Sequence, residues 1–265
     1  MTSMSSYALR DSVTMLRRNL RHVVRYPGMS FGVLLIPVFM LLLFRYVFGT
    51  TLGAGIGTRT GGYINYLTPG IIVLAVSSAS VSTAVSVNTD MTEGIINRFR
   101  TMAIARVSVL TGHVLGSVIQ TLAGAVLVTG LALALGFRPA AGPAGWLGAV
   151  GLVVLLALAC TWASVALGLL AKNPEGASNN PLPLALLPFL GSAFVPAQAM
   201  APGVRWFAEY QPFTPVIETL RSLLLGAPAG DKPLIACAWC AGLAATGYLG
   251  SRALFNRGAT TSRSR

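Results

Sequence analysis

Six apolar runs, each close to the length that crosses a lipid bilayer, restrict the fold of this chain more than any other feature. They cover approximately residues 30–48, 67–87, 109–135, 146–170, 181–201 and 233–255 of 265. One membrane-spanning helix needs about 20 apolar residues, because the hydrocarbon layer is roughly 30 Å thick. Six such helices with short connections use almost the whole chain, which leaves little sequence for a separate soluble domain.

The composition supports a membrane location. Hydrophobic residues make up 54% of the chain and charged residues only 10%, whereas soluble domains carry roughly 25% charged residues. A soluble protein of this length lacks the charge to cover so much apolar surface, and lipid removes that requirement. The sequence therefore predicts an all-α, polytopic membrane protein with six transmembrane helices in a domain spanning residues 29–255.

The first 28 residues have a different pattern. Arginines alternate with apolar residues that recur at helical spacing, which is typical of a basic amphipathic helix lying on a membrane surface. Pro27-Gly28 is expected to end this helix and turn the chain into the bilayer. The arginines are Arg10, Arg17, Arg18, Arg21 and Arg25.

The distribution of basic residues predicts the topology. With six spans, both termini lie on one side, which then holds thirteen of the 19 lysines and arginines, against five on the other side and Arg45 in the first span. Cytoplasmic loops of membrane proteins carry the excess of basic residues. The chain is therefore expected to be a multi-pass protein of a bacterial inner membrane. Both of its termini, including the tail 256–265, are expected in the cytoplasm.

The net charge of +12 could also indicate nucleic-acid binding, but the charges lie between the apolar runs and at the ends, as membrane topology requires. Cys160, Cys237 and Cys240 lie inside apolar runs. They are interpreted as small apolar residues of buried helices, so neither a metal site nor a disulfide framework is expected.

The loop 88–107 has the densest mixture of charges in the chain. A short helix starting near Asp90 would place acids at its N-terminus and arginines at its C-terminus, which complements the helix dipole. Such a helix, with an exposed aromatic residue, suits docking into the groove of a cytoplasmic partner. A solvated loop that only satisfies the excess of cytoplasmic charge remains the alternative. The candidate docking residues are Asp90, Glu93, Gly94, Ile96, Arg98, Phe99 and Arg100.

Three further polar segments stand out. Lys172, Pro174 and Glu175 lie in a polar loop after the fourth run and form a second candidate cytoplasmic contact. Ser78, Ser82 and Ser86 share one helix face, which indicates either close helix packing or a polar stripe along a transport path. Gln120, in a similar stripe of the third run, is grouped with them. Residues 202–232 alternate apolar and charged side chains, which predicts extracellular interfacial or re-entrant helices.

Several segments together resemble the ATP-binding-cassette type-2 permeases of the daunorubicin-resistance kind. The segments are Asn65 to Gly70, Glu93 to Arg100, Lys172 to Glu175, Phe194 to Pro196, Met200 to Pro202, Gln211 to Pro215, and Arg221. They follow one another in order over almost the whole chain.

The resemblance implies an exporter built from two permease subunits and two ATPase subunits, with the segment around Glu93 as the helix that receives motion from the ATPase. ATP and Mg²⁺ would then be bound by the partner, since neither Lys172 nor Lys232 follows a glycine-rich phosphate loop. No enzymatic activity is expected of this chain. The expected cargo is a hydrophobic small molecule such as a drug, an antibiotic or a lipid-like metabolite. Export of a polysaccharide or lipid-linked glycan, an ion-driven secondary transporter and a membrane scaffold remain alternatives.

Overall fold

The computed structural model describes residues 27–55, 62–92, 106–228 and 230–261, and within these ranges it contains helices and no strand. The all-α fold class is therefore confirmed for the described part of the chain. The proposed surface helix of residues 1–28 and most of the loop 88–107 lie outside it.

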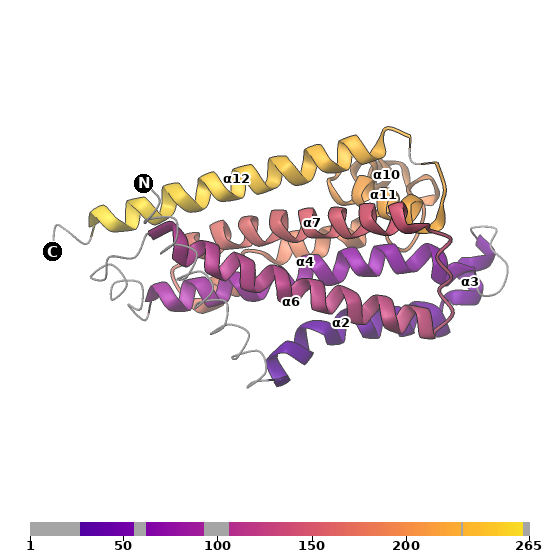
Figure 1. Cartoon of the computed structure of the whole chain (residues 1–265), viewed down its shortest axis with the longest axis horizontal. Helices are drawn as coiled ribbons and strands as arrows, with labels where there is room; N and C mark the ends of the chain where they lie inside the picture. The colour runs from indigo at the N-terminus through magenta and orange to yellow at the C-terminus, as the bar shows by residue number, and fades with distance from the viewer. Residues whose placement is uncertain (1–26, 56–61, 93–105, 229, 262–265) are drawn as a thin grey trace.

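Four helices of the described ranges are long and apolar enough to cross a membrane. They are α4 (Tyr63–Thr92), α6 (Arg106–Ala134), α7 (Pro143–Leu170) and α12 (Lys232–Thr261). They correspond to the expected second, third, fourth and sixth spans. Figure 1 shows them side by side along the long axis of the molecule.

The first expected span is bent. Helix α2 (Pro27–Tyr46) is followed by the short helix α3 (Gly49–Gly55), at an angle of 70° across the break between them, and the pair counts as a fifth span only if it is taken together. The amides of Val47 and Phe48 both donate to the carbonyl of Leu43, at 2.8 and 3.3 Å, which widens the last turn and redirects the chain. The chain beyond the first apolar run, which ends near residue 48, therefore continues as a short helix.

The expected fifth span, 181–201, is not a continuous helix. It contains α9 (Leu182–Leu186) and the 3₁₀ turns η1 (Leu187–Leu190) and η2 (Ala197–Ala199), preceded by α8 (Pro174–Asn179). Its prolines remove backbone donors and clash with the preceding turn, which explains the breaks. By length and composition the described chain thus offers four or five spans, where the sequence predicts six.

The chain from Ala171 through α8 and into the broken segment nevertheless follows α4 along most of its length. The side chain of Asn88 bonds the carbonyl of Ala171, and the hydroxyl of Tyr66 bonds the carbonyl of Ser192. Asn88 and Tyr66 are separated by about 33 Å of helix at 1.5 Å per residue. This distance is close to the hydrocarbon thickness of a bilayer. We call the two ends of the helix bundle the Asn88 end and the Tyr66 end.

Helix α4 is the centre of the bundle. The apolar window of α4 is 72% buried, whereas that of α12 is 22% buried, so α12 lies at the periphery. Small residues set the close approaches: a Cβ added to Gly168 of α7 would lie 2.5 Å from the carbonyl oxygen of Ala84 in α4. A Cβ on Gly247 of α12 would lie 2.6 Å from the main chain at Trp162 and Ala163. The helices therefore pack through backbone contact, as is common in membranes.

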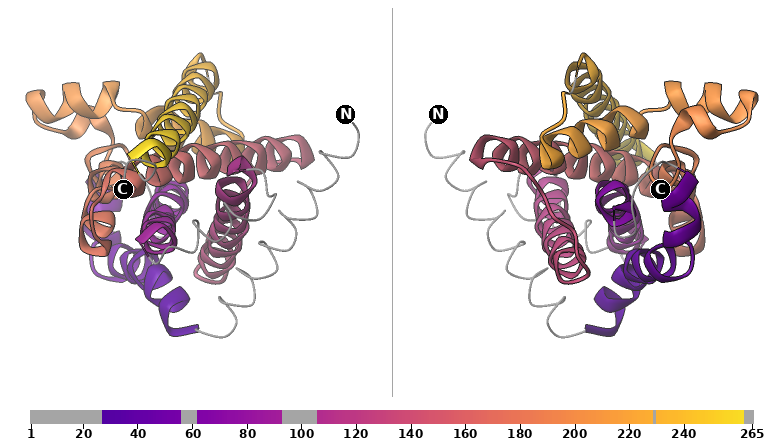
Figure 2. Two further views of the ribbon diagram at one scale, coloured as in Figure 1. Left: turned by 90° about the vertical axis from the view of Figure 1, so that its left-hand side faces the viewer. Right: turned by 90° about the vertical axis from the view of Figure 1, so that its right-hand side faces the viewer.

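Residues 202–225 form two short helices, α10 (Pro202–Tyr210) and α11 (Phe213–Leu225). Helix α11 is largely buried at the Tyr66 end and ends at Gly226, whose φ of 71° lies in the left-handed region that favours glycine. Helix α10 projects sideways from the bundle (Figure 2). Its Trp206 and Tyr210 side chains are exposed. Neither helix has the length of a span.

Candidate functional site

The Asn88 end joins α4 to the end of α7. The side-chain amide of Asn88 donates to the carbonyl of Gly168 at 3.1 Å and to that of Ala171 at 2.8 Å. The Gly168 carbonyl lies in the last turn of α7 and also accepts the amide of Ala171 at 3.2 Å, while Ala171 is the residue that caps the helix. Asn88 is 2% exposed, so the contact is sheltered and ties the two helices together where the chain leaves the bundle.

Helix α8 is a well-defined element beside this contact. Asn173 caps it, since the amide of Gly176 donates to Asn173 Oδ1 at 2.9 Å, and Pro174 occupies its first turn. Asn180 reaches back to the carbonyl of Leu167 at 3.2 Å. The predicted contact residues Lys172, Pro174 and Glu175 are all exposed. The expected polar loop is thus a short, anchored helix that presents these three side chains.

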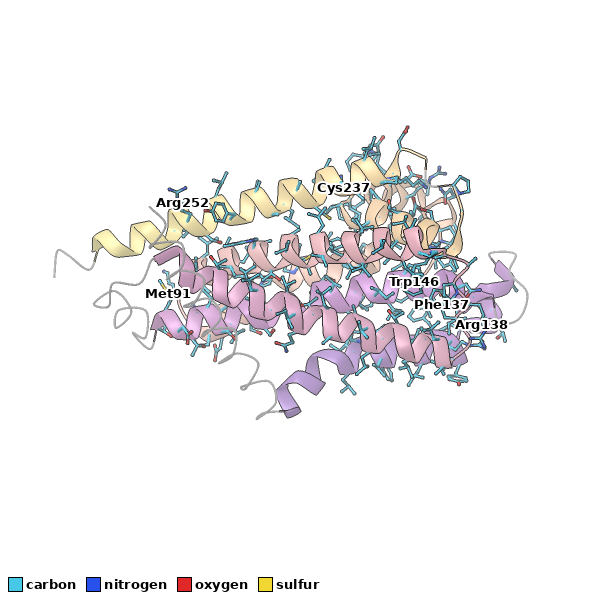
Figure 3. The ribbon with its side chains drawn as sticks, in the orientation of Figure 1. Met91, Phe137, Arg138, Trp146, Cys237 and Arg252 are labelled. Atoms are coloured by element: carbon cyan, nitrogen blue, oxygen red, sulfur yellow. The ribbon has the colours of Figure 1, made fainter. Side chains whose placement is uncertain are left out.

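Of the predicted docking residues in the loop 88–107, the structure describes Asp90. It lies inside the last turns of α4 and is 9% exposed, because α4 continues to Thr92 and does not end at Val87 as expected. Glu93, Gly94, Ile96, Arg98, Phe99 and Arg100 lie outside the described residues. Figure 3 shows Met91 of α4 and Arg252 of α12 at this same end of the molecule.

The serine stripe of α4 lies on its less protected face. Ser78 and Ser82 are half-buried and Ser86 is exposed, while Gln120 of α6 is half-buried. Ser78 donates to the carbonyl of Leu74 at 2.7 Å, and Ser82 to that of Ala79 at 2.8 Å. Both hydroxyls are satisfied within their own helix. The stripe therefore presents a mildly polar surface that the described part of the chain covers only in part.

A different set of hydroxyl groups lies inside the bundle. The hydroxyl groups of Thr83 in α4 and Ser117 in α6 share a short hydrogen bond, and Ser164 of α7 donates to Ser80 of α4 at 3.0 Å. All four side chains are buried. These contacts join the three most central helices, and sequence reasoning missed them because it selected the neighbouring serines of α4.

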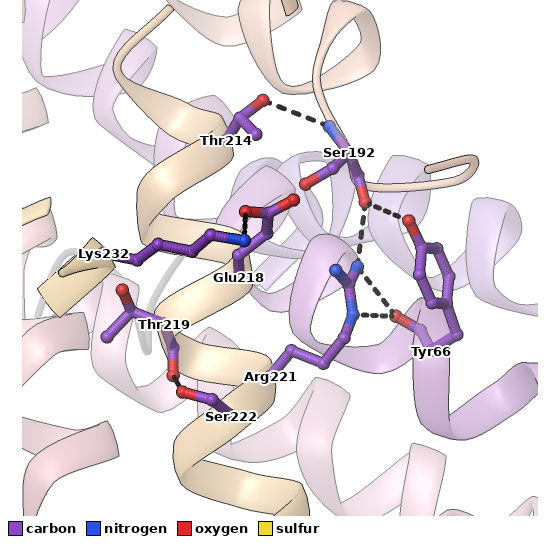
Figure 4. A network of polar contacts seen from close by, with 8 residues as sticks. All are labelled: Tyr66, Ser192, Thr214, Glu218, Thr219, Arg221, Ser222 and Lys232. Carbon is purple, nitrogen blue, oxygen red and sulfur yellow. Dashed lines mark hydrogen bonds and ion pairs between the residues drawn. The ribbon is translucent and has the colours of Figure 1, made fainter. Parts of the chain in front are cut away.

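At the Tyr66 end, Arg221 of α11 joins α4 to the broken segment (Figure 4). Its Nε and Nη2 each lie 3.2 Å from the carbonyl oxygen of Tyr66, and Nη2 lies 2.8 Å from the carbonyl oxygen of Ser192. The guanidinium carbon also lies 3.7 Å from the centre of the Tyr66 ring, a distance at which a cation is attracted to the aromatic face. Burial lowers the pKa of Arg221, while Tyr66 and Glu218 act in the opposite direction.

Two tyrosines of α4 support the same region. The hydroxyl of Tyr66 donates to the carbonyl of Ser192 at 3.0 Å, and that of Tyr63 donates to the carbonyl of Phe194 at 2.9 Å. The amide of Ser192 in turn donates to the hydroxyl of Thr214 at 3.3 Å. Residues 192–194 have no helix of their own, so side chains from α4 and α11 satisfy their main-chain groups.

The segments behind the family resemblance are brought together here. Tyr66 belongs to the segment Asn65 to Gly70, Phe194 and Thr214 belong to two later segments, and Arg221 follows them. Gly70 allows the close approach, since a Cβ there would lie 2.6 Å from Ala193 Cα. Arg221 contributes to the resemblance but is not among the predicted site residues. A single arginine in the largely apolar stretch after Glu218 is the sequence feature that could have indicated its role.

The architecture and the sequence together define a class. Residues 11–225 match the family model described as ABC-2 type transporter, so the chain belongs to the ABC-2 type transporter family. It is a multi-pass membrane protein, and its family consists of permease subunits that work with an ABC ATPase subunit.

Individual relatives agree with this assignment. The chain is 29% identical over 233 residues to the daunorubicin resistance ABC transporter permease protein DrrB1 of Streptomyces coeruleorubidus, covering 87% of this chain and 81% of the relative. It is 22% identical over 212 residues to the probable doxorubicin resistance ABC transporter permease protein DrrC of Mycobacterium tuberculosis, covering 80% and 76%. The sequence-based recognition of a drug-resistance-type ABC permease is confirmed.

Proposed function

We propose that this chain is the membrane subunit of an ATP-driven exporter of hydrophobic small molecules. The family and the names of two relatives, which concern resistance to daunorubicin and doxorubicin, support a drug or an antibiotic as cargo. Two copies of the chain, or one copy with a related permease, would associate with two ABC ATPase subunits. ATP and Mg²⁺ would be bound by those ATPase subunits.

In the proposed topology the chain lies in the inner membrane of a bacterial cell, and the Asn88 end faces the cytoplasm. In this arrangement the segment 1–28 lies on the cytoplasmic surface, the tail 256–265 is cytoplasmic and the broken segment 181–201 completes six crossings. Lys172 and Arg252 then lie on the cytoplasmic side, and Arg138 lies outside. Helices α10 and α11, within residues 202–232, would form the extracellular interfacial or re-entrant part.

The observation that carries the proposal is the exposed, capped helix α8 beside the end of α4. A motor outside the membrane can move the spans only through an element that is rigidly joined to them. Helix α8 contacts both α4 and α7, and Asn88 holds the ends of those two helices together. Force applied to Glu175 or to the chain that follows Thr92 would therefore reach the two central helices.

The transport path is proposed to follow the serine face of α4. Ser78, Ser82 and Ser86, with Gln120 of α6, form a polar surface on an otherwise buried helix. Because their hydroxyls are largely satisfied by their own helix, this surface can face an apolar cargo without binding it tightly. A second permease copy would close the path from the other side.

The experiment is ATP-dependent uptake of a fluorescent anthracycline into inside-out vesicles that contain the chain and its ATPase partner. Glu93→Ala and Arg98→Ala should abolish ATP-dependent transport while leaving membrane insertion unchanged, since they remove charges of the proposed docking loop. Glu209→Ala and Arg205→Ala are matched controls, because these residues form an exposed ion pair at the Tyr66 end. Full transport by both loop variants, or ATP hydrolysis by the purified chain alone, would contradict the proposal.

A further inference from the structure

An apolar hollow of about 460 Å³ opens into the bundle at the half nearer the Tyr66 end. Helices α6 and α7 form its two walls, while Ile72 of α4 and Leu220 and Leu224 of α11 lie at its base. Its volume lies in the range of sites that bind small ligands, about 300–1,000 Å³.

The lining is almost wholly apolar, and besides Thr129 the indole N–H of Trp146 is its one side-chain polar group. Thr129 is its one hydroxyl-bearing residue, and the Thr129 hydroxyl donates to the carbonyl of Ala125 at 2.7 Å. Sites for drug-like molecules usually place a few polar groups to orient the ligand. A lining with so little polar surface therefore suits a hydrocarbon chain better than an anthracycline, which carries hydroxyl and amine groups.

The hollow opens at the outer surface of the helix bundle. Two of its lining residues are among the well-exposed apolar side chains of the surface, Val126 at 72% and Val150 at 54%. They lie on opposite walls, α6 and α7. An occupant can therefore enter sideways from the bilayer without crossing the protein.

A positive charge lies at the end of the hollow. Arg138 is exposed, and its Nη1 lies 3.3 Å from the carbonyl oxygen of Leu133, a residue that lines the hollow. Within the described ranges Arg138 has carbonyl partners and no ion pair with a carboxylate. Trp146 also lines the hollow, and Figure 3 shows it at the same end of the molecule as Arg138. Tryptophan and arginine commonly lie at the headgroup level of a membrane.

We propose that this hollow binds one acyl chain of an anionic phospholipid, whose phosphate is held by Arg138. The lipid would belong to the leaflet at the Tyr66 end, which is the outer leaflet in the proposed topology. The apolar hollow matches the acyl chain of such a lipid, and the guanidinium of Arg138 at its end matches the phosphate. The inference requires only that the chain lies in a bilayer, so it is independent of the transported cargo.

The test uses Trp146 as a reporter in a variant with Trp162, Trp206 and Trp239 replaced by phenylalanine. The full-length protein is reconstituted with phosphatidylglycerol or phosphatidylcholine brominated on the acyl chains, which quench nearby tryptophan. Brominated phosphatidylglycerol should quench Trp146 at roughly fivefold lower mole fraction than brominated phosphatidylcholine, the size expected of one exposed charge pair. Arg138→Gln should remove this difference, and Arg205→Gln should not.

A second pair of variants tests the hollow itself. Gly130 lines the hollow and Gly151 does not, while a Cβ on either glycine meets no atom within 4 Å. Gly130→Phe should fill the hollow and lower the phospholipid retained by detergent-purified protein roughly tenfold, as measured by native mass spectrometry. Both glycine changes are made in the chain that keeps all four tryptophans. Gly151→Phe should retain as much lipid as that unmodified chain.

Four outcomes would overturn the inference. The first three are equal quenching by both lipids before Arg138 is changed, unchanged lipid retention in Gly130→Phe, and displacement of the retained lipid by an anthracycline. The last result would make the hollow a cargo site. A fourth, disulfide crosslinking of two copies through Val150→Cys in a cysteine-free background, would show that a second copy covers the hollow instead.

Discussion

The guanidinium of Arg221 and the main-chain carbonyl of Tyr66 lie 3.2 Å apart, although the two residues are separated by 155 positions in the chain. The same guanidinium stacks on the Tyr66 ring and reaches Ser192. A planar group with several donors can make all three contacts at once, and the ammonium of a lysine cannot. This contact therefore joins α4, α11 and the broken segment through one side chain.

Arg221→Lys is expected to lower the free energy of unfolding in detergent by about 2 kcal/mol, the contribution of a hydrogen bond to a charged group. The measurement is a denaturation curve of the purified protein. Arg205→Lys is the matched control, because the exposed pair of Arg205 with Glu209 contributes little. Equal effects of the two changes would show that the contacts of Arg221 are not what stabilises this end.

The contact between Gly168 and Ala84 predicts an effect of opposite sign at two glycines of α7. Alanine normally stabilises a helix over glycine by up to about 1 kcal/mol, so Gly151→Ala, which meets no neighbour within 4 Å, should be neutral or stabilising. Gly168→Ala would place its methyl group 2.5 Å from a main-chain oxygen of Ala84 and should cost about 1–3 kcal/mol. Thermal unfolding of the two variants under one condition compares them, and a stabilised Gly168→Ala would refute the close packing of α4 and α7.

The hydrogen bond between Thr83 and Ser117 should appear as a coupling free energy. Thr83→Val and Ser117→Ala, combined in a double-mutant cycle, are expected to show roughly 0.6 kcal/mol of interaction, the average for such contacts in membrane proteins. Ser82→Ala with Ser117→Ala is the control, since the Ser82 hydroxyl bonds its own helix. Coupling of similar size in the control would mean that the cycle reports general repacking.

Asn88→Ala should weaken the joint at the proposed cytoplasmic end. The change removes the side-chain donor of the Ala171 carbonyl and leaves the Gly168 carbonyl with the Ala171 amide alone, and loss of a sheltered donor costs about 1–3 kcal/mol. Amide hydrogen exchange should accelerate in the last turn of α7 and in α8. ATP-dependent transport should fall by more than the loss of folded protein accounts for. Asn180→Ala, which removes an exposed bond to Leu167, should change little because water can replace it. Transport that remains normal in Asn88→Ala would argue against transmission through this joint.

The sequence predicts the spans well where length alone decides them. Helices α4, α6, α7 and α12 form near the expected positions because a long apolar run has no other stable conformation in lipid. The prolines of 181–201 correctly indicate irregularity. They do not indicate that the segment runs beside α4, since that depends on donors from Tyr63 and Tyr66 far away in the chain.

The inward face of α4 was not predictable from spacing. Lipid and protein interior are similarly apolar, so polar periodicity does not reveal which side of a membrane helix faces its neighbours. Ser78, Ser82 and Ser86 are regularly spaced and share a face, yet Ser80 and Thr83 make the contacts to other helices. Only the positions of α6 and α7 distinguish these two faces.

The broken segment has a consequence for how permeases of this kind can diverge. Its carbonyls at Ser192 and Phe194 depend on donors from Tyr63, Tyr66 and Arg221, so three distant stretches of chain must change in concert. A chimaera that takes residues 181–201 from a relative should assemble only when the donor positions come from the same parent. Recombination between relatives is thus expected to succeed at breakpoints that keep these stretches together and to fail elsewhere.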